Sequence, residues 1–120
     1  MWLRYYSSLY PGNKPADFTR YCDALRANLE EPGCMEALLL MMTASKAASE
    51  DRLSRVMAPT LVIMGNRYPD FKDPEAEAQW VAESLHGTYK MIKDAGHCPH
   101  AEMPEVTGPL VLSFLQMLKK

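Results

Sequence analysis

The 120-residue chain has few cysteines, no long apolar run and no block of charge of one sign. Its longest apolar run, residues 37–42, is far too short to cross a bilayer, so we expect no membrane partner. With 13 Lys and Arg against 15 Asp and Glu and no basic run, the composition also argues against nucleic-acid binding. The first residues lack the charged and then apolar layout of a signal peptide, and we therefore expect a cytoplasmic location.

The side chains that usually bind metals are also sparse and badly spaced. Cys22, Cys34 and Cys98 form no CxxC pair and no zinc-type spacing, and such a scattered, odd set suits reduced thiols in the cytosol. His86 and His100 have no third ligand at metal spacing. We expect no metal site and no cofactor.

What the chain does contain is an alternation of helical and strand-like segments without internal repeats. Apolar spacing and proline and glycine signals predict four helices and two strands. The helices are expected over residues 15–31, 35–48, 73–86 and 104–118, and the strands over residues 60–64 and 88–93. We expect the third helix to direct four side chains inward, namely Ala76, Trp80, Val81 and Leu85. Pro109 either bends the last helix or marks its true start.

The strand over residues 60–64 is apolar on both faces, which is typical of a strand covered by helices on each side. One strand–helix–strand unit predicts an α/β fold with a right-handed parallel pair. Two strands make a poor sheet, and a bare edge rich in Leu, Val and Ile tends to pair with another strand. We therefore expect oligomerisation to complete the sheet.

Three stretches in this order resemble the C-terminal half of the α/β-hydrolase family. Residues 58–65 are similar to its penultimate core strand, Pro69-Asp70-Phe71 to the acid loop, and Ala95-Gly96-His97 to the loop after the last strand. The resemblance covers nearly all of this chain but about half of the family's fold. It implies a partial α/β-hydrolase fold, with residues 1–56 as a cap-like or lid-like helical segment and residues 57–120 as the C-terminal core segment.

The resemblance also shows which catalytic parts this chain lacks. Hydrolases of this family use a serine on a Gly-x-Ser-x-Gly turn, and no such sequence occurs here. His97 matches the family's general base. The position of the family's acid is occupied by Tyr68, which cannot act as a carboxylate, and Asp70 two residues later is the candidate replacement.

Each candidate site residue also has a plainer interpretation. His97 is either a general base or a remnant that hydrogen-bonds locally. Tyr68 either fills the place of the acid with a hydroxyl or packs, and together with Phe71 it is a candidate ligand-binding residue. The aromatic cluster near the N-terminus either lines a cleft or covers apolar surface; its members are Trp2, Tyr5, Tyr6 and Tyr10.

Our leading hypothesis is a truncated hydrolase-like protein that is non-catalytic by itself and forms a homodimer. The dimer would form through the edge of the strand over residues 60–64 or through the cap helices. In a second hypothesis, the chain is one half of a serine hydrolase, with His97 as base and Asp70 as orienting acid, and needs a complementary N-terminal half. A third is a small-molecule binding module lined by Tyr68, Phe71 and His97.

Overall fold

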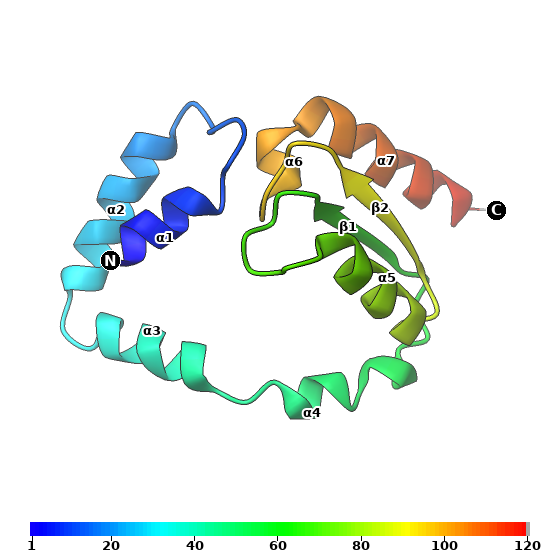
Figure 1. Ribbon diagram of the computed structural model, residues 1–120, viewed down its shortest axis with the longest axis horizontal. Coiled ribbons are helices and arrows are strands. Elements are labelled where there is room, and N and C mark those ends of the chain that lie inside the picture. The colour runs from blue at the N-terminus through cyan, green and yellow to red at the C-terminus, as the bar shows by residue number, and fades with distance from the viewer. Residues whose placement is uncertain (120) are drawn as a thin grey trace.

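Two parallel strands, β1 (Leu61–Gly65) and β2 (Thr88–Ile92), form the sheet of the computed structural model, which describes residues 1–119 (Figure 1). Lys120, the last residue of the predicted core segment, lies outside the described residues. The register pairs Leu61 with Thr88 and Gly65 with Ile92. The predicted α/β class with two parallel strands is confirmed.

Helix α5 (Pro74–Ser84) connects the two strands and packs against both. It begins where the sequence indicates, because the Asp73 carboxylate accepts a hydrogen bond of 3.0 Å from the Ala76 N–H. Ala78 and Ala82, exposed by 0% and 2%, face the sheet and let the helix backbone approach it closely. The inward placement predicted for Trp80 and Ala76 is wrong: Trp80 is 44% exposed and Ala76 is also exposed, because Ala78 and Ala82 occupy the buried face.

The C-terminal helices α6 (Pro99–Glu102) and α7 (Pro104–Met117) follow β2. Side chains of α7, including Leu110 and Phe114, share a small cavity with Leu61 of β1 and Lys90 of β2, so α7 lies against the sheet. The prediction that Pro109 marks the start of this helix is wrong, since α7 begins at Pro104 and continues through Pro109.

The N-terminal helices form an arc that leads back to β1 (Figure 1). They are α1 (Trp2–Ser8), α2 (Phe18–Glu30), α3 (Cys34–Thr43) and α4 (Ala47–Glu50), and a 3-10 turn over Leu53–Arg55 follows. The described residues thus hold seven α-helices, and the expected number of about four is wrong. The additional helices, α1, α4 and α6, have seven, four and four residues, too few to show a helical period in the sequence.

Two predicted helix boundaries also differ from the structure. The helix expected to open at Pro15 begins at Phe18, and the Pro15 carbonyl instead accepts from the Phe18 N–H in a turn (3.0 Å). The helix expected over residues 35–48 breaks at Ala44, whose ψ of 136° is extended. No helix among residues 1–119 has the length and apolar character needed to cross a bilayer.

The buried core is small for a chain of this length. Among residues 1–119, the buried core consists of Leu9, Tyr10, Ala78, Ala82, Ile92 and Ala95, with Pro99 buried beside it. The accessible surface is 8657 Å², whereas a folded monomer of 13.6 kDa exposes about 6,600 Å². The radius of gyration, 16.5 Å, likewise exceeds the roughly 14 Å expected for a compact domain of this length. Much apolar surface is therefore left without a covering layer.

Candidate functional site

His97 lies in the loop that follows β2, at the carboxyl end of the sheet, where α/β folds place reactive side chains. Its backbone N–H donates to the Leu9 carbonyl (2.9 Å), so the loop docks on the segment after α1. Gly96 is required at this contact, because a Cβ there would collide with the Pro11 ring and the Leu9 carbonyl. The imidazole of His97 is exposed.

Tyr68 and Phe71, in the loop after β1, lie beside His97. The Tyr68 ring meets the His97 ring edge to face, with ring centroids 4.7 Å apart, and meets the Phe71 ring at 4.9 Å. Burial, and then the negative charge of Asp70, raises the pKa of the Tyr68 hydroxyl. Tyr68 is therefore neutral and provides no charge to stabilise an imidazolium.

Asp70, the candidate replacement acid, has a different partner. Its carboxylate accepts a hydrogen bond of 2.7 Å from the hydroxyl of Tyr5 in α1. That bond, with burial and the charge of Asp70, raises the pKa of Tyr5 to about 12. Within residues 1–119, the His97 imidazole makes no hydrogen bond or ion pair with a carboxylate. The structure thus brings Tyr68 and Phe71 to His97, whereas it brings Asp70 to Tyr5.

Glu102 is a residue of this region that sequence reasoning missed. Its side chain, 2% exposed, accepts from the Gly96 N–H (2.6 Å) and from the Gly12 N–H (3.1 Å). One carboxylate therefore ties the His97 loop to the segment between α1 and α2. Nothing in the sequence marks Glu102 as buried. It lies two residues before Pro104, the first residue of α7, where exposed acidic residues are common.

The N-terminal aromatic cluster has two separate roles. Tyr6 stacks on Phe18 and Tyr21 of α2 at centroid distances of 5.7 and 5.5 Å, and its hydroxyl lies 3.3 Å from that of Tyr10. Desolvation, followed by hydrogen bonds with Cys98 and Tyr6, raises the pKa of Tyr10. Tyr6 and Tyr10 thus cover apolar surface, which is one of the two interpretations of the aromatic cluster.

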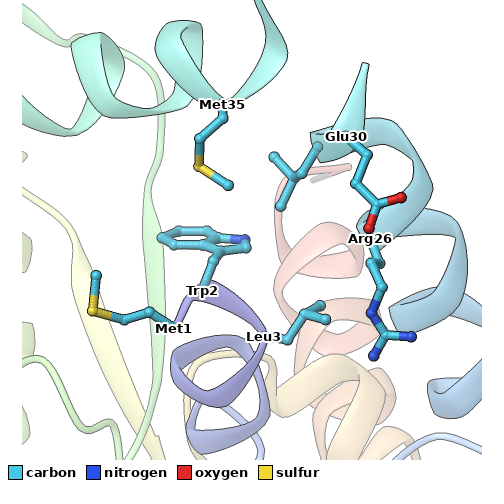
Figure 2. A pocket seen from close by; sticks show the side chains of 7 residues that line it. Met1, Trp2, Leu3, Arg26, Glu30 and Met35 are labelled. Atoms are coloured by element: carbon cyan, nitrogen blue, oxygen red, sulfur yellow. The ribbon is translucent and has the colours of Figure 1, made fainter. Parts of the chain in front are cut away.

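Trp2 and Tyr5, in contrast, line cavities. One cavity has a volume of about 190 Å³. Figure 2 shows Met35 of α3 pointing toward the Trp2 ring there, with Arg26 and Glu30 along α2. A second cavity, of about 380 Å³, lies between α1 and α3. Its lining is mostly apolar and consists of Met1, Trp2, Tyr5, Met35, Leu38, Leu39 and Met42.

The order of the strands and helices and the position of the site loops together indicate the fold class. Two parallel strands with site loops at their carboxyl ends, a connecting helix and a preceding set of helices form a partial α/β arrangement of the hydrolase-like kind. No family model matches the chain, and no curated protein matches it in sequence.

A solved structure shows the same fold. It is described as "Est816 as an N-Acyl homoserine lactone degrading enzyme", and it is similar to this chain with a TM-score of 0.60 and 23% sequence identity. The match covers 94% of this chain and 47% of the solved chain, so this chain spans about half its length. The resemblance is thereby supported at the level of a hydrolase-like fold, of which this chain is a part.

Proposed function

We propose that this chain contributes the cap-like helices and the base-bearing loop of a hydrolase-like fold, and that it does not hydrolyse acyl substrates by itself. One observation carries the proposal. His97 lies at the carboxyl end of β2, but none of the serines lies on a glycine-flanked turn from a strand to a helix; they are at positions 7, 8, 45, 49, 54, 84 and 113.

Chemistry supports the same conclusion. Acyl transfer of this kind needs a nucleophile, a base oriented by an acid, and backbone donors for the oxyanion. Within residues 1–119, His97 is available as the base, but no carboxylate is hydrogen-bonded to it. Loss of triad members alone lowers turnover by factors of about 10⁴–10⁶.

The test is an assay of the purified chain with p-nitrophenyl esters and with an N-acyl homoserine lactone. The lactone is included because the similar solved structure is described as degrading such compounds. We expect a rate no higher than that of buffer, equal for the parent, His97→Ala and the control His100→Ala. Turnover that His97→Ala abolishes and His100→Ala retains would overturn the proposal.

The half-length match favours a second candidate, in which a separate polypeptide supplies the nucleophile half. Adding such a half should then produce ester hydrolysis that depends both on its serine and on His97. In that complex, Asp70 would orient His97. To do so, the Asp70 carboxylate would have to release the hydroxyl of Tyr5. Tyr5→Phe should therefore raise the rate of the reconstituted enzyme, and no gain in rate on mixing would exclude this candidate.

A small-molecule binding role is favoured at a different place from the predicted one at Tyr68, Phe71 and His97. The cavity between α1 and α3, which includes none of these three residues, has the size and apolar lining of a ligand pocket. A ligand bound there should raise the melting temperature of the parent. Leu38→Trp, which fills the cavity, should remove that increase. Tyr68 and Phe71 remain predicted ligand-binding residues.

A further inference from the structure

The two edges of the sheet differ in chemistry. Along β2, Thr88 and Lys90 are exposed, and a lysine on an edge strand opposes pairing with a further strand. Along β1, the residues Leu61-Val62-Ile63-Met64 are all apolar and all partly exposed. The outer edge of β1, the side that faces away from β2, has no such protection.

Backbone groups on the outer edge of β1 lack a strand partner. The Thr60 carbonyl accepts from the Thr88 N–H (3.1 Å), and the Asn66 N–H donates to a carbonyl of β2 (3.0 Å). Even-numbered residues of this segment therefore direct their N–H and C=O groups toward β2, and Leu61 and Ile63 direct theirs toward the outer edge. No other strand among residues 1–119 joins this edge.

The surface that the chain leaves exposed is large enough for a stable interface. Its accessible surface exceeds that of a compact monomer by roughly 2,000 Å², whereas a standard interface buries about 800 Å² on each partner. Helix α7, which lies against the sheet, contributes exposed apolar side chains to this excess. Val111, Leu112 and Leu115 are exposed by 38%, 60% and 48%.

We propose that two copies of this chain pair through the outer edges of their β1 strands, antiparallel, to form one continuous four-stranded sheet. A second copy is the partner that carries the same unprotected apolar edge and is present in every solution of the chain. A two-fold axis perpendicular to the sheet makes the central pair antiparallel and places both α7 helices over one face and both α5 helices over the other. This inference is independent of any hydrolytic activity.

The proposal includes a register. On the outer edge the odd-numbered residues form the hydrogen-bonded pairs, and Ile63 is the central residue of Leu61–Gly65. A two-fold axis centred on this residue pairs the strands over their whole length, and it places Ile63 opposite Ile63 of the second copy. Residues in such a pair have Cα atoms about 5.5 Å apart, which lies within the range of Cα separations that disulfides span.

Sedimentation equilibrium of the full chain provides the first test. We expect a mass twice the 13.6 kDa of one chain at high concentration and dissociation on dilution. Ile63→Pro removes an N–H from the outer edge and leaves the β1–β2 hydrogen bonds in place, so it should yield a monomer with the circular dichroism of the parent. A folded parent that stays monomeric at every concentration, or a folded Ile63→Pro variant that still dimerises, would overturn the proposal.

Cross-linking provides a test that does not depend on the proline variant folding. Ile63→Cys and Lys90→Cys are compared in a background with Cys22, Cys34 and Cys98 changed to Ser. Lys90 is the register partner of Ile63 on β2 and is the more exposed, but it lies one strand away from the interface. Mild oxidation should link Ile63→Cys into dimers and leave Lys90→Cys at the background level.

Equal cross-linking at both positions, or none at Ile63→Cys, would overturn the proposal. A chain that is monomeric alone and forms a complex only with a nucleophile-bearing half would assign the edge of β1 to that other occupant, and would also overturn it.

Discussion

At the scale of single residues, two acidic side chains join segments that are distant in the sequence. Asp70 binds the hydroxyl of Tyr5, 65 residues earlier, and Glu102 binds the N–H of Gly12, 90 residues earlier. Both contacts attach the N-terminal segment to the loops at the carboxyl end of the sheet. The position of the His97 loop therefore depends on residues near the N-terminus, outside the predicted core segment.

Glu102→Ala should lower the free energy of unfolding by about 2 kcal/mol, because the N–H of the buried Gly96 and the N–H of the exposed Gly12 both lose their acceptor. Glu102→Gln should lose less, since its amide oxygen still accepts one of the two bonds. Urea denaturation followed by circular dichroism measures both. Glu31→Ala, at an exposed position, is the control and should change stability by less than about 0.5 kcal/mol; an equal loss there would contradict this role.

Tyr5→Phe should reduce stability at neutral pH by roughly 0.5 kcal/mol, since one exposed hydrogen bond is lost. The pKa of Tyr5 rises from 10.0 to about 12 on folding, so its contribution is fully present below pH 10 and is lost as the pH rises toward 12. The stability difference between the parent and Tyr5→Phe should shrink over that interval, as urea denaturation at a series of pH values would show. Parallel pH profiles of the two proteins would contradict the assignment.

At the scale of elements, the β1–α5–β2 unit and the N-terminal helices are held in different ways. The unit is held by strand pairing and by the buried alanines of α5, with Gly65 in close contact with the loop that carries His97. Helices α3 and α4 leave most of their side chains exposed. Substitutions in the β1–α5–β2 unit should therefore affect the free energy of unfolding more than substitutions in α3 and α4.

Gly65→Ala should destabilise the protein by about 3 kcal/mol, because its Cβ would collide with the carbonyl oxygens of Ala95 and Gly96. Gly108→Ala is the matched control. Gly108 lies within α7 with open space around the position of a Cβ, but it precedes Pro109, whose ring disfavours a Cβ on the preceding helical residue. This conflict offsets the gain in helix propensity, so alanine there should change stability by less than about 1 kcal/mol. Thermal and urea unfolding of both variants measure the difference, and effects of equal size would contradict this packing.

At the scale of the whole molecule, the chain covers its apolar side chains incompletely. Large apolar residues are exposed on α3 and on α7, including Leu40 at 65% and Leu112 at 60%. A soluble monomer seldom leaves this much apolar area without a partner. Association and folding are therefore expected to be coupled.

The melting temperature should rise with protein concentration, because dimerisation stabilises the folded state by mass action. Ile63→Pro, which blocks the outer edge of β1, should melt at a temperature that does not depend on concentration. Differential scanning calorimetry over a wide range of concentrations measures both. A parent melting temperature that does not change with concentration would contradict the coupling.

The sequence by itself determined the β1–α5–β2 unit, because its signals are local: an apolar strand ended by Gly65, and Asp73 as the cap of α5. It also placed His97, Tyr68 and Phe71 together, since loops at the carboxyl ends of parallel strands converge. The short helices could not be predicted, because seven or four residues are too few to show a period.

Only the tertiary structure decided which partners the carboxylates take. Asp70 binds Tyr5 and Glu102 binds the backbone of Gly12 because chain folding brings distant segments within 3.1 Å, and no local pattern encodes such a contact. The inward face of α5 was decided in the same way. Close packing against the sheet selects Ala78 and Ala82 and leaves the larger Trp80 outside.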